Sequence, residues 1–523
     1  MHRYRSTGTT RRLTTALLAL GTAGALLLTG CGQSGESHSS SDDLKGGGRT
    51  ADGFPAPAPD GPDAHNGEQQ DDESRDIAPS PDHLSTFALD VDTASYGYAR
   101  RTLEDGSLPD PSTVRPEEFV NSFRQDYERP DGDGFSVTVD GARTKDDDWS
   151  LVRVGLATRA ADGDRERPPA ALTFVIDVSG SMAEPGRLDL AKDALGTMTD
   201  RLRDQDSVAL VTFSDTAETV LPMTRLDDNR ARIHDAVDSL EPADSTNLGA
   251  GVETGYETAV EGLRKGATNR VVLLSDALAN TGDTDADTIL ERIADERREH
   301  GITLFGVGVG SDYGDALMER LADKGDGHTT YVSTEKEAEE VFCEQLPRHV
   351  DLTARDAKAQ VAFDPETVEE FRLIGYDNRQ VADEDFRDDS VDGGEVGPGH
   401  TVTALYAVRT RSGTEAGHLA TATVRWLDPD SRTPHEESER IEASALHGDL
   451  WSTAPRGLQI AAAAAYFADA LRRDDSRWTD LPAGPTLDEL SFRVRELIRY
   501  REDKQLNDLS DAIEAARTLM DTA

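Results

Sequence analysis

Three short polar clusters in this sequence combine carboxylates with hydroxyls, and each stands beside an apolar run or a predicted helix. They are DVSGS (Asp177–Ser181), DSTNLG (Asp244–Gly249) and LSD (Leu274–Asp276). Together they offer oxygen ligands, without His or Cys. Hard oxygen ligands suit Mg²⁺, with Ca²⁺ or Mn²⁺ as alternatives, and they exclude a zinc or copper assignment. The clusters therefore predict a divalent-cation site, provided that the fold brings them together.

Each cluster also has a local explanation. Ser or Thr before a helix is usually a cap, and Asp at the end of a strand often forms a turn. In the first cluster, Gly180 relaxes the backbone, so that the hydroxyls of Ser179 and Ser181 can face one point. The elements that carry the clusters decide between these readings.

The stretch Ala170–His349 alternates apolar strands with amphipathic helices, which predicts a doubly wound α/β domain. The predicted strands are ALTFVI, SVALVTF, RVVLLS, ITLFGVGV and HTTYVS, with a short antiparallel edge strand at TVLPM. Continuous apolar strands separated by helices indicate a mixed, mostly parallel sheet that is covered on both faces. Ligands of such sheets bind beyond the carboxyl ends of the strands, and all three clusters fall at that edge.

The order of these motifs resembles a known family. DVSGS, then STN before a helix, then Asp at the end of the next central strand are similar to the metal-ion-dependent adhesion site (MIDAS) of von Willebrand factor type A (VWA) domains. The resemblance implies a Rossmann-like VWA domain with the site residues Asp177, Ser179, Ser181, Thr246 and Asp276. It implies direct binding of the metal by the two serines, direct or water-mediated binding by Thr246, and mainly water-mediated binding by the two aspartates.

The resemblance also implies a function and shows one departure. With few carboxylates in direct contact, the cation keeps one position open for an acidic side chain of a protein partner. The family usually carries Gly and a further acid after the last Asp, whereas this chain has Ala277 and Leu278. Asp276 itself is kept, so metal binding should survive, and a reduced affinity stays an open alternative.

Residues 1–30 predict a lipoprotein signal peptide. Four arginines precede the apolar run Leu13–Leu28, which is short for a membrane span of about 20 residues. The tetrad LTGC resembles a bacterial lipobox, which implies a lipid on Cys31 and a place on the extracytoplasmic face of the bacterial cell membrane; a cleaved signal with an incidental Cys is the alternative. Cys343 would then lack a disulfide partner. Residues 31–82 are rich in Gly, Ser, Pro and acids, which predicts a disordered tether.

The α/β domain is flanked by residues 83–169 and 350–523. The first flank predicts a short strand, a helix from Ala94, a second helix opened by Pro116 and two strands; the second predicts strands followed by three helices. Both resemble the flanking regions of bacterial VWA lipoproteins. We expect the strands of Phe135–Ala157 to pair with those of Lys358–Leu427, so that the α/β domain is inserted into one β-rich platform.

Charge and motifs limit the function. Against 55 Lys and Arg stand 101 Asp and Glu, a net charge of −46, which repels nucleic acid. We therefore expect a metal-dependent protein-binding lipoprotein and not an enzyme. A structural envelope protein whose metal only braces loops is one alternative. Another is a phosphatase, because Leu89-Asp90-Val91-Asp92-Thr93 matches a DxDxT start in which Asp90 would be the nucleophile.

Overall fold

The computed structural model describes most of the chain from residue 83 to residue 522, with several gaps. It describes residues 83–145, 148–160, 167–243, 245–276, 286–293, 300–309, 318, 321, 328–342, 346, 350–389, 391, 393–429, 431–472, 480–500 and 503–522. The predicted signal peptide, Cys31 and the predicted tether lie outside these residues, as do Asp244, Ala277, Leu278 and Cys343. Among the helices that the structure describes, none has both the length and the apolar character of a membrane span.

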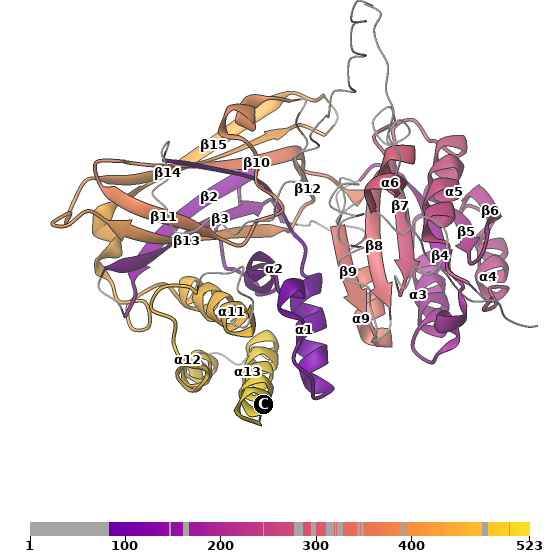
Figure 1. Ribbon diagram of the computed structural model, residues 1–523. Helices are drawn as coiled ribbons and strands as arrows, with labels where there is room; N and C mark the ends of the chain where they lie inside the picture. The colour runs from indigo at the N-terminus through magenta and orange to yellow at the C-terminus, as the bar shows by residue number, and fades with distance from the viewer. Residues whose placement is uncertain are drawn as a thin grey trace, which may run out of the picture. The chain divides into compact units, whose positions relative to one another are not determined.

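The α/β domain, which begins at Ala170, is built on a six-stranded sheet (Figure 1). In spatial order its strands are β6 (Ala217–Arg225), β5 (Ser207–Phe213), β4 (Ala170–Asp177), β7 (Thr268–Ser275), β8 (Thr303–Val309) and β9 (His328–Val332). All neighbouring pairs are parallel except β5 and β6, which confirms the mixed sheet and its antiparallel edge strand. Every residue of β4 is buried, as expected for a strand covered on both faces.

Helices cover both faces of this sheet. They are α3 (Leu188–Arg201), α4 (Arg230–Asp238), α5 (Leu248–Glu261), α6 (Ala286–Arg292) and α9 (Glu335–Glu340). Consecutive residues of β4 point to opposite faces: Phe174 belongs to a core with α3, α4 and α9, and Val175 belongs to a core with α5 and α6. The predicted doubly wound arrangement is confirmed.

The flanks form two antiparallel sheets that share one core, which we call the platform. One sheet has the order β11 (Val368–Ile374), β13 (Thr401–Thr410), β3 (Trp149–Thr158) and β2 (Phe135–Arg143). The other has the order β1 (Leu84–Ala88), β10 (Ala354–Phe363), β14 (His418–Leu427) and β15 (Pro434–Glu442), with β12 (Gly394–Val396) beside β10. Because β3 pairs with β13, strands from both flanks share one sheet, which confirms the predicted insertion.

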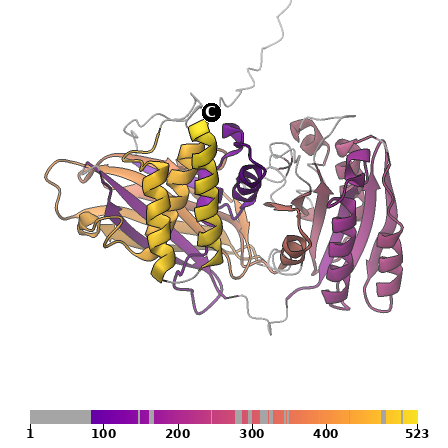
Figure 2. The same cartoon turned by 90° about the horizontal axis from the view of Figure 1, so that it is seen from below.

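Helices complete the platform beside the four-stranded sheet, as the two views together show (Figures 1 and 2). They are α1 (Ala94–Glu104), α2 (Pro116–Asn121), α11 (Arg456–Arg472), α12 (Leu487–Tyr500) and α13 (Lys504–Thr522), with short 3-10 turns η1 (Pro111–Thr113), η4 (Asp383–Arg387) and η5 (Ala443–His447). The alanine-rich sequence of α11 predicts a helix that packs through its small face, and the structure buries this face and the larger side chains as well. Every residue from Ile460 to Arg472 is buried, because neighbouring helices and β13 surround α11.

Candidate metal site

The predicted site lies at the topological switch point of the six-stranded sheet. β4 is flanked by β5 and β7, and the helices that follow β4 and precede β7, α3 and α5, cover opposite faces. A crevice forms at the carboxyl edge of such a sheet, where the connections of two adjacent strands lead to opposite faces. Asp177, the last residue of β4, has no exposed surface. The loop after it is held to the end of β5 and to the segment before α5, because Val178 N donates to Phe213 O at 3.0 Å and Val178 O accepts from Ala243 N at 2.5 Å.

The first loop turns its two hydroxyls toward each other. Ser179 N donates to Asp177 Oδ1 at 2.8 Å, and this bond bends the chain directly after the strand. The 3-10 turn η2 (Gly180–Ala183) follows, and it brings Ser181 Oγ to 3.2 Å from Ser179 Oγ. The sequence DVSGS therefore places one carboxylate and two hydroxyls around one point.

The third loop is joined to the first through Asp177. Ser275 Oγ, at the end of β7, donates to Asp177 Oδ2 at 2.6 Å, so the two oxygens of this carboxylate accept from two different loops. Asp276 follows directly and is fully buried. The pKa of Asp177 is raised above its ordinary value, chiefly by burial; the hydrogen bonds from Ser179 and Ser275 oppose this rise, and the nearby Asp276 adds to it. Two buried carboxylates at one strand edge make a strongly electronegative position.

The second loop lies at the same edge, and its helix cap is not Thr246. The first turn of α5 is capped by Asn247, whose Oδ1 accepts from Ala250 N at 3.2 Å. Asn247 N donates to Ser214 O at 2.6 Å, directly after β5. Thr246 is 1% exposed. The local explanation of the STN motif as a Thr cap is therefore wrong, because its Asn takes that role.

Arg187, at the start of α3, also belongs to this site, although sequence reasoning did not select it. Its Nη1 donates to Asp276 Oδ2 at 2.8 Å and to Ser181 O at 3.1 Å, and its Nη2 lies 3.0 Å from Glu184 Oε2. Only 4% of its side chain is exposed. Arg187 thus joins the first loop to the third. The one signal in the sequence is an arginine at a helix start, where the helix dipole disfavours a cation.

The structure thus brings together Asp177, Ser179, Ser181 and Asp276, and it places Thr246 on the loop beside them. The side chains of this set are carboxylates and hydroxyls in a buried, negatively charged crevice. That chemistry fits a hard divalent ion such as Mg²⁺. When bound, the ion would supply an electrophilic position to which an additional carboxylate oxygen can bind.

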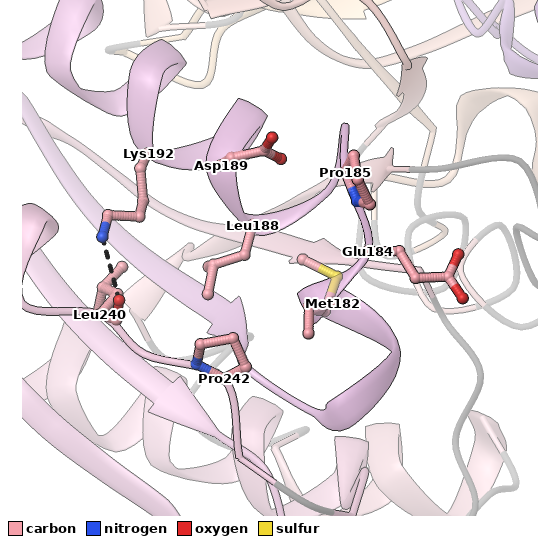
Figure 3. Close-up of a pocket in the computed structure, with 9 residues that line it drawn as sticks. Met182, Glu184, Pro185, Leu188, Asp189, Lys192, Leu240 and Pro242 are labelled. Carbon is pink, nitrogen blue, oxygen red and sulfur yellow. Dashed lines mark hydrogen bonds between the residues drawn. The ribbon is translucent and has the colours of Figure 1, made fainter.

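A shallow hollow of roughly 300 Å³ adjoins the first and second loops (Figure 3). Its lining residues are Met182, Ala183, Glu184, Pro185, Leu188, Asp189, Lys192, Leu240 and Pro242. Lys192 lies at one side of it, and its Nζ donates to the carbonyl oxygens of Asp238 and Leu240 at 2.8 and 3.1 Å. The hollow therefore has an apolar floor and charged side chains around it.

A second cluster of ligand-type side chains joins the platform to the α/β domain. Asp90, Asp92 and His328 are buried, and one oxygen or nitrogen of each lies within 4.8 Å of the others. Arg379 lies against both carboxylates: its Nε is 3.5 Å from Asp90 Oδ2, and its Nη2 is 3.6 Å from Asp92 Oδ2. Its guanidinium compensates part of their charge, so we interpret the cluster as a buried ion-pair network.

The neighbours of this cluster support that interpretation. Asp92 Oδ1 accepts from Thr329 N at 3.1 Å, and His328 Nε2 lies 2.9 Å from Glu395 O. Burial, and after it the positive charge of Arg270, lowers the pKa of His328 to about 4. The carboxylate of Asp92 therefore holds β9 of the α/β domain to the platform.

The same cluster bears on the DxDxT motif. Asp90 follows β1, which pairs antiparallel with β10, and only 2% of Asp90 is exposed. Asp90 Oδ1 accepts from Asp92 N at 2.9 Å. The described residues thus give Asp90 neither the parallel sheet nor the open position that a phosphoryl-accepting nucleophile would use.

Comparison with known proteins identifies the class. The model of the von Willebrand factor type A domain matches residues 171–344, the model of the C-terminal region of YfbK matches 350–481, and a further model described as von Willebrand factor matches 65–152. Fold and motifs together define a VWA-domain protein.

Its relatives identify the particular family. Protein YfbK of Escherichia coli K12 is 34% identical over 433 residues, which cover 80% of this chain and 70% of the relative. The chain belongs to the YfbK family. A protein of Synechocystis is 26% identical over 41% of this chain and 50% of its own length. A von Willebrand factor type A structure from Catenulispora acidiphila is 16% identical, with a TM-score of 0.47, and the match covers 73% of this chain and 91% of that chain.

Proposed function

We propose that this chain is a lipid-anchored binding protein on the extracytoplasmic face of the bacterial cell membrane. In this proposal its VWA domain holds a divalent cation, Mg²⁺ in first place, which binds an acidic side chain of a protein partner. The observation that supports the proposal best is the convergence of Asp177, Ser179 and Ser181 with the third loop at the switch point. The proposal describes a binding device and not a catalyst.

The residues have distinct roles in this proposal. The hydroxyls of Ser179, Ser181 and Thr246 face the ion and carry no charge, so the ion keeps its attraction for a carboxylate of the partner. Asp177 and Asp276 supply the negative charge that draws a divalent cation into a buried crevice. Cys31 carries the lipid, and the acidic chain is expected to bind no nucleic acid.

Replacing Cys31 by Ser should move the protein from the membrane fraction to the soluble fraction, and an unchanged fractionation would contradict the anchor.

A calorimetric titration tests the metal site. Protein treated with EDTA and dialysed is titrated with Mg²⁺, and the double variant Ser179→Ala/Ser181→Ala should bind at least about tenfold more weakly, because two ligand hydroxyls are lost. The matched control removes another hydroxyl pair, Thr423 and Ser438 of the platform, whose Oγ atoms lie 2.9 Å apart. Its Mg²⁺ affinity should equal that of the wild type.

Capture from envelope extracts tests the binding role. The wild type should retain a protein that EDTA releases and Mg²⁺ restores, and the double variant should not retain it. Mg²⁺ binding without any EDTA-sensitive partner would instead support the alternative in which the metal only braces loops. A wild type that takes up no divalent cation would contradict both.

A further inference from the structure

The guanidinium of Arg187 contacts one of the two buried carboxylates of the predicted metal site. It contacts Asp276 Oδ2 at 2.8 Å and the carbonyl of Ser181 at 3.1 Å, so the same side chain touches two of the loops that are expected to surround the ion. Its partners also include Glu184, whose side chain is 66% exposed. Of these contacts, the ion pair with the fully buried Asp276 is the one shielded from water.

The position of Arg187 is unfavourable for a guanidinium unless nearby negative charge compensates it. Arg187 directly precedes α3, so it lies near the positive end of the helix dipole, and its side chain is almost fully buried. Desolvation of a guanidinium is costly unless a carboxylate compensates it. Asp276 is that carboxylate, and it is 89 residues away in the sequence.

The charge balance of the site follows from these contacts. The buried charges of Asp177, Asp276 and Arg187 sum to one net negative charge, and a divalent cation changes this sum to one net positive charge. Glu184 is left out of this sum because its side chain is 66% exposed and its charge is screened by solvent. Without the arginine the loaded site would be neutral. A single positive charge is the charge that one carboxylate of a partner would neutralise.

We propose that Arg187 is a built-in counter-charge of the metal site, which stabilises the metal-free form through Asp276 and lowers the affinity for the divalent cation. The inference rests on the proposed function, because it concerns the same site. Metal and guanidinium share one carboxylate, so each weakens the other's interaction with it. Arg187 then keeps the loaded site positive and ready for an acidic partner.

Calorimetric titration of EDTA-treated protein with Mg²⁺, and with Mn²⁺ followed by electron paramagnetic resonance, tests this inference. Arg187→Met keeps the length of the side chain but removes its charge, and it should bind Mg²⁺ more tightly, by a factor on the order of ten for one charge at this range. Arg187→Lys retains the charge and should stay within about threefold of the wild type. If the Met variant does not fold, Arg187→Gln replaces it, because its amide can still donate to Asp276.

The matched control is Arg167→Met. Arg167 also forms an ion pair with a fully buried aspartate, Asp206, at 2.6 Å, but Asp206 precedes β5 and therefore lies at the opposite edge of the sheet. This variant should lose stability with no change in Mg²⁺ affinity. Thermal unfolding gives a second readout: metal-free Arg187→Met should melt below the wild type, and saturating Mg²⁺ should raise its Tm by more than it raises that of the wild type.

The outcomes separate the two proposals. Normal Mg²⁺ binding by the wild type with equal or weaker binding by Arg187→Met would overturn the inference alone. A wild type that binds no Mg²⁺ would overturn the proposed function, and the inference with it. Tighter binding by both Arg187→Met and Arg167→Met would also overturn the inference, because the effect would then not belong to this site.

Discussion

At the scale of single residues, Glu117 shows how strongly burial can change a charge. It lies in the first turn of α2, and 2% of it is exposed. Its Oε2 has no hydrogen-bond partner among the described residues, and it lies so close to Gly375 that a Cβ there would approach it to 2.1 Å. Desolvation is the largest influence, and it raises the pKa of Glu117 to about 7.

The first prediction concerns the pH dependence of stability. Because the folded pKa of Glu117 lies above the ordinary value of 4.5, its contribution to stability is fully present below pH 4.5 and is lost as the pH rises through 7. Glu117→Gln removes this titration. The unfolding free energy of the variant relative to the wild type should therefore increase between pH 4.5 and pH 8.5, by about 3 kcal/mol. Urea unfolding followed by circular dichroism at the two pH values measures it, and a pH-independent difference would contradict it.

Whether a residue of the site could be predicted depends on how far apart in the sequence its contacts lie. Asp177, Ser179 and Ser181 were predictable, because their mutual contacts lie within five consecutive residues. Arg187 was not, because an arginine at a helix start is ordinarily solvated and its partner Asp276 belongs to another loop. Sequence spacing records local geometry, whereas a buried ion pair between distant loops is decided by the fold.

At the scale of elements, two glycines allow α5 to lie close to the sheet. A Cβ on Gly255 would lie 2.3 Å from Val175 Cγ2 of β4, and one on Gly251 would lie 2.6 Å from the ring of Phe213 in β5. This close approach positions the start of α5, and thus the loop of Thr246, beside the end of β4. Gly196 of α3 differs, because its Cβ would meet no atom closer than 3.8 Å.

These glycines give a paired prediction. Gly255→Ala should destabilise the protein by about 1–3 kcal/mol, because the new methyl group overpacks a buried interface. Gly196→Ala should stabilise it by about 0.5–1 kcal/mol, because the helix interior gains a better helix former without a clash. Thermal unfolding of both variants checks the pair. If the Tm of both variants shifted in the same direction, contact of the glycine with the sheet would not determine the effect on stability.

The predictability of elements follows their burial. The strands of the α/β domain were found because they are buried runs of apolar residues, such as β4 and β8. β15 was missed, since only Ile441 of its nine residues is buried and its sequence PHEESERIE has no apolar alternation. It is a charged edge strand, a type that resists edge-to-edge aggregation but leaves little pattern in the sequence.

At the scale of the whole described part of the chain, buried charges connect the α/β domain to the platform. Arg270 of β7 is fully buried, and its Nη2 donates to Glu395 Oε2 of β12 at 2.7 Å. Arg355 Nη1 lies 3.6 Å from the other carboxylate oxygen. The sequence does not indicate that either arginine contacts Glu395, because Arg270 and Glu395 lie in distant segments of the chain.

The third prediction tests this connection. Glu395→Gln should lower the unfolding free energy by about 3 kcal/mol, because it leaves the buried guanidinium of Arg270 without its carboxylate. Adding Arg270→Met should recover part of the loss, since the stranded charge is then removed. Urea unfolding of both variants measures the two steps. A double variant that is less stable than Glu395→Gln would contradict the prediction.

The insertion of the α/β domain has a mechanical consequence. The chain leaves the platform after β3 and returns to it at β10, and the two crossing segments are joined where Arg159 Nη2 meets Asp351 Oδ2 at 3.0 Å. Tension on the inserted domain is therefore shared by two covalent crossings, and the domain cannot swivel about a single bond. A load applied at its carboxyl edge would reach the platform as a pull rather than as a free rotation.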